Sequence, residues 1–425
     1  MTGTVEERDT TAGVFPGWIV VGAAFVLLMA NSGFIFYGQA VYLDALTDER
    51  GFSTGAASLG QSIVFVVGGL VGPRVGRLIT DRDVRLVVLG GLVISWVSVV
   101  ALGRVEELWQ LYLVNTSLGV GFSAAGLVPA TTVITRWFEV RRSVALAIAS
   151  TGLSVGGLTF TQLVSWWIRR DGLEVATPWL VVVWAACTLP VVPLLWPTPE
   201  HRGVLASGAV AGSVSMGAPY DVAVRSRFFK AVTAGYVLVL GMQVGGITHL
   251  VKLGNERAGD GTGGRLIAAL AIASVVARLI GGVVADSRPL HLLAIGFATT
   301  QGLALALLSQ VDTASTLLLC AVLFGATIGN ILMLQPLLFA DAMGPREYAR
   351  IFALNQLVVV AGVALGPYLL GALHDAASYE VSYLVAAVLC GVGTFLLSRG
   401  GSTAQARAEL WDATAPGGPT APTPR

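Results

Sequence analysis

The chain has 425 residues, of which 55% are hydrophobic and only 12% are charged, and its formal net charge is +1. A soluble domain carries about 25% charged residues, so this composition excludes a large soluble core and indicates a polytopic membrane protein. Basic residues never alternate with aromatic ones, which excludes a nucleic-acid-binding surface. The three cysteines lie far apart in apolar stretches and are expected to be small buried side chains without a disulfide or a metal: Cys187, Cys320 and Cys390.

Twelve apolar stretches of membrane-spanning length follow one another along the chain. We expect the spans at 17–43, 54–77, 86–103, 109–133, 143–167, 178–197, 229–251, 266–285, 290–309, 314–339, 350–373 and 380–398. They predict an all-α integral membrane protein with two six-helix halves, 17–197 and 229–398, joined by a Pro/Gly/Ser-rich cytoplasmic linker at 198–228. The acidic segment 1–16 is interpreted as a cytoplasmic tail and not as a signal peptide, and the tail 399–425 is expected to be disordered.

Glycine and proline positions match between the two groups of six spans. Pro129 precedes Gly156 by 27 residues, and Pro336 precedes Gly362 by 26 residues, with a charged loop inside each interval. Such repeats are typical of pseudo-symmetric carriers whose substrate site lies between two halves near the bilayer midplane. Lys and Arg are concentrated in the loops on the side of the N-terminus, for example in 74–85, which predicts that both termini are cytoplasmic.

One arginine lies well inside an apolar span. Arg278 stands in the stretch 266–286, seven residues and therefore about 10 Å before Ala285. A charged side chain at the bilayer centre costs between about 2.5 and 17 kcal/mol, depending on how far it can snorkel. The alternative is an arginine that reaches the lipid head groups, but the depth favours a polar cavity in which Arg278 binds an anion through its planar fork of donors.

The loop between the second and third spans resembles the conserved loop of the major facilitator superfamily. That motif combines glycine, Asp-Arg and basic residues, and here the order GPRVGRLITDRDVR lacks the glycine expected after Asp-Arg-x. The resemblance implies the twelve-helix fold of that superfamily and a cytoplasmic gate. Its residues here are Gly76, Arg77, Asp81, Arg82 and Arg85, with Asp286 at the corresponding position of the second half.

A narrower resemblance is to the monocarboxylate transporter family and its bacterial oxalate/formate exchanger relatives. It rests on Gly17-Trp18 at the first span, on Arg136-Trp137-Phe138 with Arg141-Arg142 and ASTGLSVGG (149–157), and on Arg278 in the eighth span. In that family the arginine of helix 8 binds the substrate carboxylate, which implies the same role for Arg278.

This chain departs from the family pattern at three places. Ser274 stands where animal members have an aspartate used in proton coupling, and the first span, 17–43, contains no lysine. Asn355-Gln356 stands where oxalate exchangers have a second basic residue. One cationic group favours a monoanion over a dianion, and Ser274 puts proton coupling in doubt.

Several other polar residues inside the spans are candidates for substrate contact. His249 could bind substrate or carry a proton, or it could be an interface histidine bonded to a backbone carbonyl. Asn115 could hydrogen-bond a carboxylate or could join two helices. Weaker candidates of the same kind are Tyr37, Gln39, Gln243, Asn330 and Asn355.

We therefore expect a secondary transporter of a small monocarboxylate, similar to lactate, pyruvate or formate, that works by alternating access and proton symport. The alternatives are carboxylate exchange, export of other small molecules, or a carboxylate sensor. No catalytic, metal-binding or cofactor motif occurs in the sequence, so no enzyme is expected. The expected setting is a bacterial plasma membrane, with the protein as a monomer.

Overall fold

The structure is a computed structural model, and it describes residues 15–52, 54–207, 217–259 and 262–412. In these residues twelve helices or helix pairs are long and apolar enough to cross a membrane, which confirms the predicted number of spans. Most of the predicted tail 1–16 and the stretch 413–425 lie outside the described residues.

The first half begins with an interrupted helix. Helix α1 (Gly17–Asn31) continues through the π-helix η1 (Ser32–Tyr37) into α2 (Gly38–Arg50). The part that is apolar enough to cross a membrane is Gly17–Tyr37, which ends before the predicted bound at residue 43. The other spans of this half are α3 (Thr54–Asp81), α4 (Val84–Leu102), the pair α5 (Leu108–Ala124) and α6 (Leu127–Trp137), α7 (Arg142–Asp171) and α8 (Leu173–Thr188).

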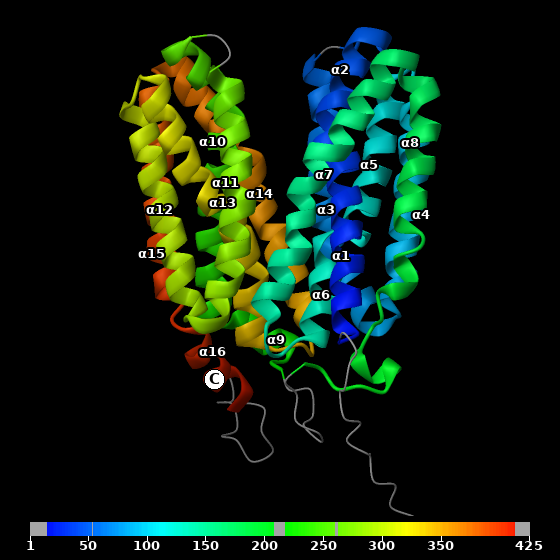
Figure 1. Ribbon diagram of the computed structural model, residues 1–425, viewed down its shortest axis with the longest axis vertical. Coiled ribbons are helices and arrows are strands. Elements are labelled where there is room, and N and C mark those ends of the chain that lie inside the picture. Colours follow the sequence, from blue (N-terminus) through cyan, green and yellow to red (C-terminus); the bar gives the residue numbers. More distant parts are fainter. Residues whose placement is uncertain (1–14, 53, 208–216, 260–261, 413–425) are drawn as a thin grey trace, which may run out of the picture.

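The second half contains six long helices. These are α10 (Arg227–Ala258), α11 (Thr262–Ser287), α12 (Leu290–Gln310), α13 (Ala314–Met343), α14 (Tyr348–Ala376) and α15 (Tyr379–Arg399). The short helix η2 (Val192–Leu194) ends the sixth span, and the described parts of the linker contain η3 (Pro199–Arg202) and α9 (Tyr220–Arg225). Figure 1 shows that the start of α1, α9 and the C-terminal α16 lie at the same end of the bundle, which we call the terminal face.

Two features of local structure differ from the simplest reading of the sequence. The fourth span, found at Leu108–Trp137, consists of two helices because Gly126 adopts a non-helical conformation (φ −97°, ψ −143°) between α5 and α6. Pro129 then lies in the first turn of α6, where backbone N–H groups have no partner within the helix. The tail predicted to be disordered contains the helix α16 (Thr403–Asp412), which buries Ala406 and Leu410, four residues apart on one face.

The two halves use the same glycine packing, as the matched positions predicted. A side chain at Gly156 of α7 would collide with the backbone carbonyl of Met29 in α1. Side chains at the matched Gly362 of α14 and at Gly366, one turn further on, would collide with the carbonyls of Val237 and Gly241 in α10. Glycine allows two helix backbones to approach this closely. The repeat in the sequence therefore corresponds to a repeated helix contact in the structure.

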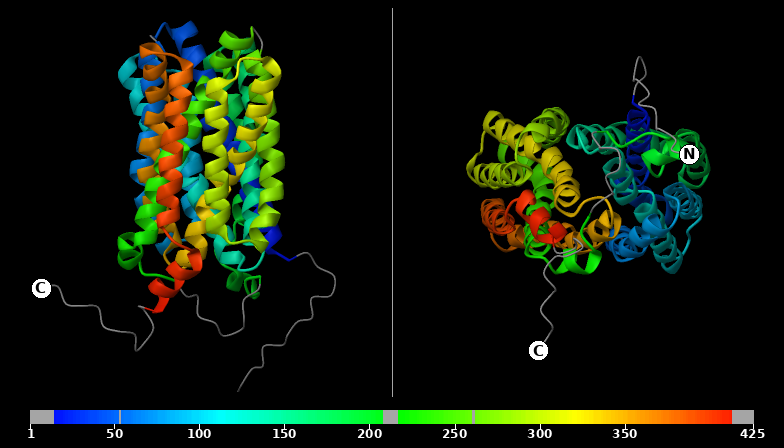
Figure 2. Two further views of the ribbon diagram at one scale, coloured as in Figure 1. Left: turned by 90° about the vertical axis from the view of Figure 1, so that its left-hand side faces the viewer. Right: turned by 90° about the horizontal axis from the view of Figure 1, so that it is seen from below.

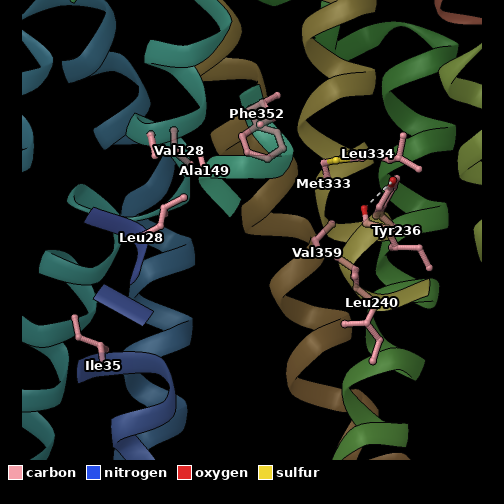
Figure 3. Packing of buried hydrophobic residues seen from close by; sticks show 14 of the residues in the cluster. Leu28, Ile35, Val128, Ala149, Tyr236, Leu240, Met333, Leu334, Phe352 and Val359 are labelled. Carbon is pink, nitrogen blue, oxygen red and sulfur yellow. Dashed lines mark hydrogen bonds between the residues drawn. The ribbon is translucent and has the colours of Figure 1, made fainter. Parts of the chain in front are cut away.

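Each half has its own packed interior, and the halves surround a common axis. Figure 3 shows Leu28, Ile35 and Val128 in the first half, apart from Tyr236 and Met333 in the second. The view from below in Figure 2 shows the two groups of helices side by side around the centre. Large apolar side chains cover the outer surface and are exposed there, as a bilayer-facing surface requires; examples are Leu86 (66%), Val97 (64%) and Leu319 (70%).

Candidate functional site

A cavity of about 510 Å³ lies between the two halves. Helices α1, η1, α3, α5, α6 and α7 line it from the first half, and α10, α11, α13 and α14 line it from the second. Most of the lining side chains are apolar, and one guanidinium, that of Arg278, is present. This is the position between repeated halves at which a carrier binds its substrate.

Arg278 is buried at the boundary between the halves. Its side chain is 1% exposed, and Nη1 donates a hydrogen bond to the backbone carbonyl of Ser150 in α7, which belongs to the opposite half. Its Nε has no partner among the described residues. In the described part of the chain no carboxylate pairs with this guanidinium. A buried cation without a counter-charge provides a site for an anion.

The π-helix η1 places two aromatic side chains in the cavity. Phe36 and Tyr37 both line it, and each is 42% exposed. The Ser32 hydroxyl donates to the Leu153 carbonyl at 2.9 Å and ties η1 to α7. Gly157 of α7 makes room for the Tyr37 ring, because a side chain there would meet that ring. π-Helical turns within α-helices occur frequently at functional sites.

Six polar residues line the cavity besides Arg278 and Tyr37, among them Ser274, Gln356 and Asn31. Ser274 lies one turn before Arg278 on α11, and Gln356 lies on α14. Asn31 is 2% exposed, and its Oδ1 has no partner among the described residues. We did not predict Asn31 from the sequence, although an amide within a predominantly apolar span is a signal that could have identified it.

Asn115 and Asn330 support the helices and do not line the cavity. Asn115 donates to the Leu111 carbonyl at 3.0 Å within α5. Asn330 of α13 donates to the carbonyls of Ala277 in α11 and Ala326 at 2.9 Å each. An amide that joins two membrane helices in this way stabilises their packing by about 0.6 kcal/mol. Asn330 thereby holds the turn of α11 that carries Arg278.

His249 and Gln243 also lie outside the cavity lining. His249 of α10 is 3.0 Å from the carbonyl oxygen of Pro367 through Nε2 and 3.4 Å from the Tyr379 hydroxyl through Nδ1. The sequence left two roles open for His249, and this contact with a backbone carbonyl corresponds to the role that does not involve proton transfer. Gln243 is buried, and its Oε1 has no partner in the described part of the chain.

Asn355 and Gln39 face neighbouring helices. Asn355 accepts a hydrogen bond from the Thr233 hydroxyl at 3.1 Å, so its amide faces α10, whereas its neighbour Gln356 lines the cavity. The backbone carbonyl of Gln39 accepts from the Gln61 amide at 2.5 Å. Of the residues predicted to contact substrate, the structure therefore brings Arg278 and Tyr37 together in the cavity.

The halves meet between the cavity and the terminal face. Gly76 of α3 packs so tightly on α14 that a side chain would collide with the Ala349 carbonyl. The Ser143 hydroxyl of α7 donates to the Asp286 carboxylate of α11 at 2.5 Å. These contacts include two of the residues predicted to form a gate, Gly76 and Asp286.

The other predicted gate residues do not bridge the halves. Arg77, Asp81 and Arg82 are exposed at the end of α3. Arg85 pairs with Asp83 at 2.6 Å. Val84 occupies the position where the family glycine was expected, and the preceding Asp83 caps α4 by accepting from the Arg85 backbone N–H at 2.9 Å. Its hydrogen bonds from the Arg85 side chain lower the pKa of the Asp83 carboxyl.

We expect the substitution Gly76→Val to open the contact at the terminal face. The added side chain must displace the α14 backbone at Ala349, so the closed arrangement loses stability relative to an open one. Ala147 lies against Gly282 across the interface, so a thiol introduced by Ala147→Cys, with the native cysteines replaced by alanine, reports this opening. The rate at which a reagent alkylates that thiol should rise on the order of tenfold. The control is Gly90→Val, where no atom lies near the added group, and its alkylation rate should stay unchanged. Equal alkylation rates in the Gly76→Val and Gly90→Val proteins would contradict the prediction.

Solved structures show the same fold. The human organic anion transporter MFSD10 (TETRAN) superposes with a TM-score of 0.70 at 15% identity, covering 90% of this chain and 99% of that one. The fucose:proton symporter FucP of E. coli superposes with a TM-score of 0.69 at 14% identity, covering 91% and 99%.

Sequence relatives agree with the structural comparison. The chain is 25% identical to "Monocarboxylate transporter 13" of Rattus norvegicus over 91% of this chain and 87% of the relative. It is 27% identical to "Monocarboxylate transporter 11" of Homo sapiens (89% and 82%) and 25% identical to an "MFS-type transporter" of Gibberella moniliformis (91% and 91%). These fungal and mammalian relatives do not support the expected bacterial origin. The model of the Major Facilitator Superfamily matches residues 20–359 and 266–416, so the chain is a multi-pass membrane transporter that belongs to this superfamily.

Proposed function

We propose that the protein carries a monocarboxylate across a membrane by alternating access, and that Arg278 binds the carboxylate. The observation that carries this proposal is the isolated position of the guanidinium, buried between the halves with a backbone carbonyl as its hydrogen-bond acceptor. A carboxylate fits the planar fork of donors and supplies the absent counter-charge. The names of the relatives, monocarboxylate transporters 11 and 13, support the same substrate class.

The contact between Arg278 and Ser150 suggests how binding is linked to the motion of the halves. Arg278 belongs to the second half and Ser150 to the first, so their hydrogen bond joins the halves on the closed side of the cavity. A carboxylate competes with the Ser150 carbonyl for the same donors. Its binding replaces a charge–dipole contact by a charge–charge contact and weakens the link between the halves, which allows the terminal face to open.

The lining of the cavity favours anion exchange over the proton symport expected from the resemblance. Within the part of the chain that the structure describes, the lining contains no Asp, Glu or His. His249 is bonded outside it, and Ser274 cannot take up a proton near neutral pH. If the site were empty while the cavity changes from one side of the membrane to the other, the charge of Arg278 would be buried without a counter-charge. The return of the carrier to its starting conformation therefore requires a second bound anion. The basic loops lie on the side of the N-terminus, and we place this side in the cytoplasm. The terminal face is then the cytoplasmic face of the carrier.

Counterflow in vesicles that contain the purified protein tests this function. We expect labelled pyruvate to enter rapidly when the vesicles hold unlabelled pyruvate, and at least about tenfold more slowly when they hold chloride or no anion. An imposed pH gradient should change the initial rate by less than about twofold. Uptake driven by the gradient into anion-free vesicles would establish symport in place of exchange. Absence of saturable uptake for every carboxylate would refute the proposed substrate class.

A further inference from the structure

The cavity is larger than a three-carbon acid requires. At about 30 Å³ for each water-sized group, the six heavy atoms of lactate occupy less than about 180 Å³. The cavity volume of about 510 Å³ falls in the range of sites that enclose drug-sized ligands, about 300–1,000 Å³. A lactate bound at Arg278 would leave most of the apolar lining in contact with water.

Four of the side chains that line the cavity from the first half are aromatic, and they stand beside aliphatic ones such as Leu28 and Leu153. Phe36, Tyr37, Phe65 and Phe122, which we call the aromatic wall, come from η1, α3 and α5. The ring centres of Phe36 and Tyr37 are 5.0 Å apart, those of Phe36 and Phe65 are 5.5 Å apart, and those of Phe65 and Phe122 are 6.0 Å apart. All three pairs meet edge to face, so each ring is held in place by its neighbour.

The charge and the aromatic wall belong to opposite halves. Arg278 lies on α11 of the second half, where the other lining residues on that helix are small or aliphatic, including Leu270 and Ala271. A ligand with a carboxylate at one end and an apolar ring at the other fits this arrangement, because its carboxylate can bind Arg278 while its ring packs on the aromatic wall. Aliphatic lining accepts any apolar group, whereas aromatic rings with fixed orientation favour a flat aromatic group.

We propose that the preferred substrate is an aryl monocarboxylate, an acid whose carboxylate binds Arg278 while its aromatic ring packs on the aromatic wall. This inference rests on the proposed function, since it requires the carboxylate site at Arg278. It specifies the substrate further than the lactate-like acid expected from the sequence. It also assigns Phe36, Phe65 and Phe122 as residues that determine specificity.

The inference is tested by binding of four probes to the purified full-length protein, measured by calorimetry or thermal shift: acetate, phenylacetate, cyclohexylacetate and the neutral 2-phenylethanol. We expect phenylacetate to bind at least about tenfold more tightly than acetate because of the additional apolar area that it buries. We expect phenylacetate to bind at least about threefold more tightly than cyclohexylacetate, because a flat aromatic ring packs better on the aromatic wall than a puckered aliphatic ring.

Two variants and a matched control separate the contributions of the wall and the charge. Phe65→Leu should abolish the preference for phenylacetate over cyclohexylacetate. Phe395→Leu, at an exposed phenylalanine of α15 outside the lining, should change none of the four affinities. Arg278→Gln should abolish binding of all three acids and leave 2-phenylethanol unaffected.

The outcomes distinguish this inference from the proposed function. If acetate binds as tightly as phenylacetate, and only through Arg278, the carboxylate site stands and the aryl preference is wrong. If Phe65→Leu weakens acetate and phenylacetate equally, the wall is structural and the inference is also overturned. If Arg278→Gln leaves the affinities of the acids unchanged, the proposed function fails together with it.

Discussion

Substitution of Arg278 by methionine should abolish carboxylate transport and at the same time stabilise the protein. The guanidinium is 1% exposed and has no carboxylate partner in the described structure, so burial of its charge opposes folding. Replacement of buried charges by apolar groups of similar volume stabilises proteins by up to about 1–4 kcal/mol. We therefore expect uptake to fall at least about 100-fold while the melting temperature rises.

Arg278→Lys provides the intermediate case. It keeps the charge but loses the planar fork, so transport should fall about tenfold or more and binding should lose its selectivity for carboxylates. Initial rates of uptake and thermal unfolding of the detergent-solubilised protein measure both effects. Arg169→Gln, at an exposed arginine near the end of α7, is the matched control and should behave as the wild type. Wild-type uptake by the Arg278→Met protein would disprove the role of this arginine.

The second large effect is expected at the repeated glycine contacts. Leucine in place of Gly156 cannot fit beside the Met29 carbonyl, and leucine in place of Gly366 cannot fit beside the Gly241 carbonyl. In each case one long helix must move away from its partner, because the obstacle is backbone and not a flexible side chain. We expect each variant to lose more than about 3 kcal/mol of stability, which is a large part of the total for a folded protein.

Size-exclusion chromatography of solubilised membranes measures the folded fraction of these variants. Gly22→Leu is the control, because it adds the same side chain to α1 at a position where no atom lies within 4 Å of an added Cβ. This variant should elute as a single peak at the wild-type level, whereas Gly156→Leu and Gly366→Leu should aggregate. Equal yields of all three proteins would show that the close approach of the helices is not required.

Hydropathy was sufficient to predict the number and order of the twelve spans, because these features depend on the length and order of apolar segments. It could not predict which face of a helix meets the cavity. Asn115 and Asn31 are both buried amides within spans, yet of these two only Asn31 lines the cavity, since the rotation of each helix is set by packing against its neighbours. The break at Gly126 depends on backbone conformation, and hydropathy carries no signal for it.

The π-helix of the first span has a consequence for the evolution of the carrier. A π-turn holds one residue more than the α-helical turn that could replace it, because its hydrogen bonds reach five residues back instead of four. Loss of one residue within η1 (Ser32–Tyr37) would restore a regular helix and turn Phe36 or Tyr37 away from its present direction. The rest of the bundle would keep its contacts. A single codon deletion could therefore give a descendant with a different substrate range and the same fold.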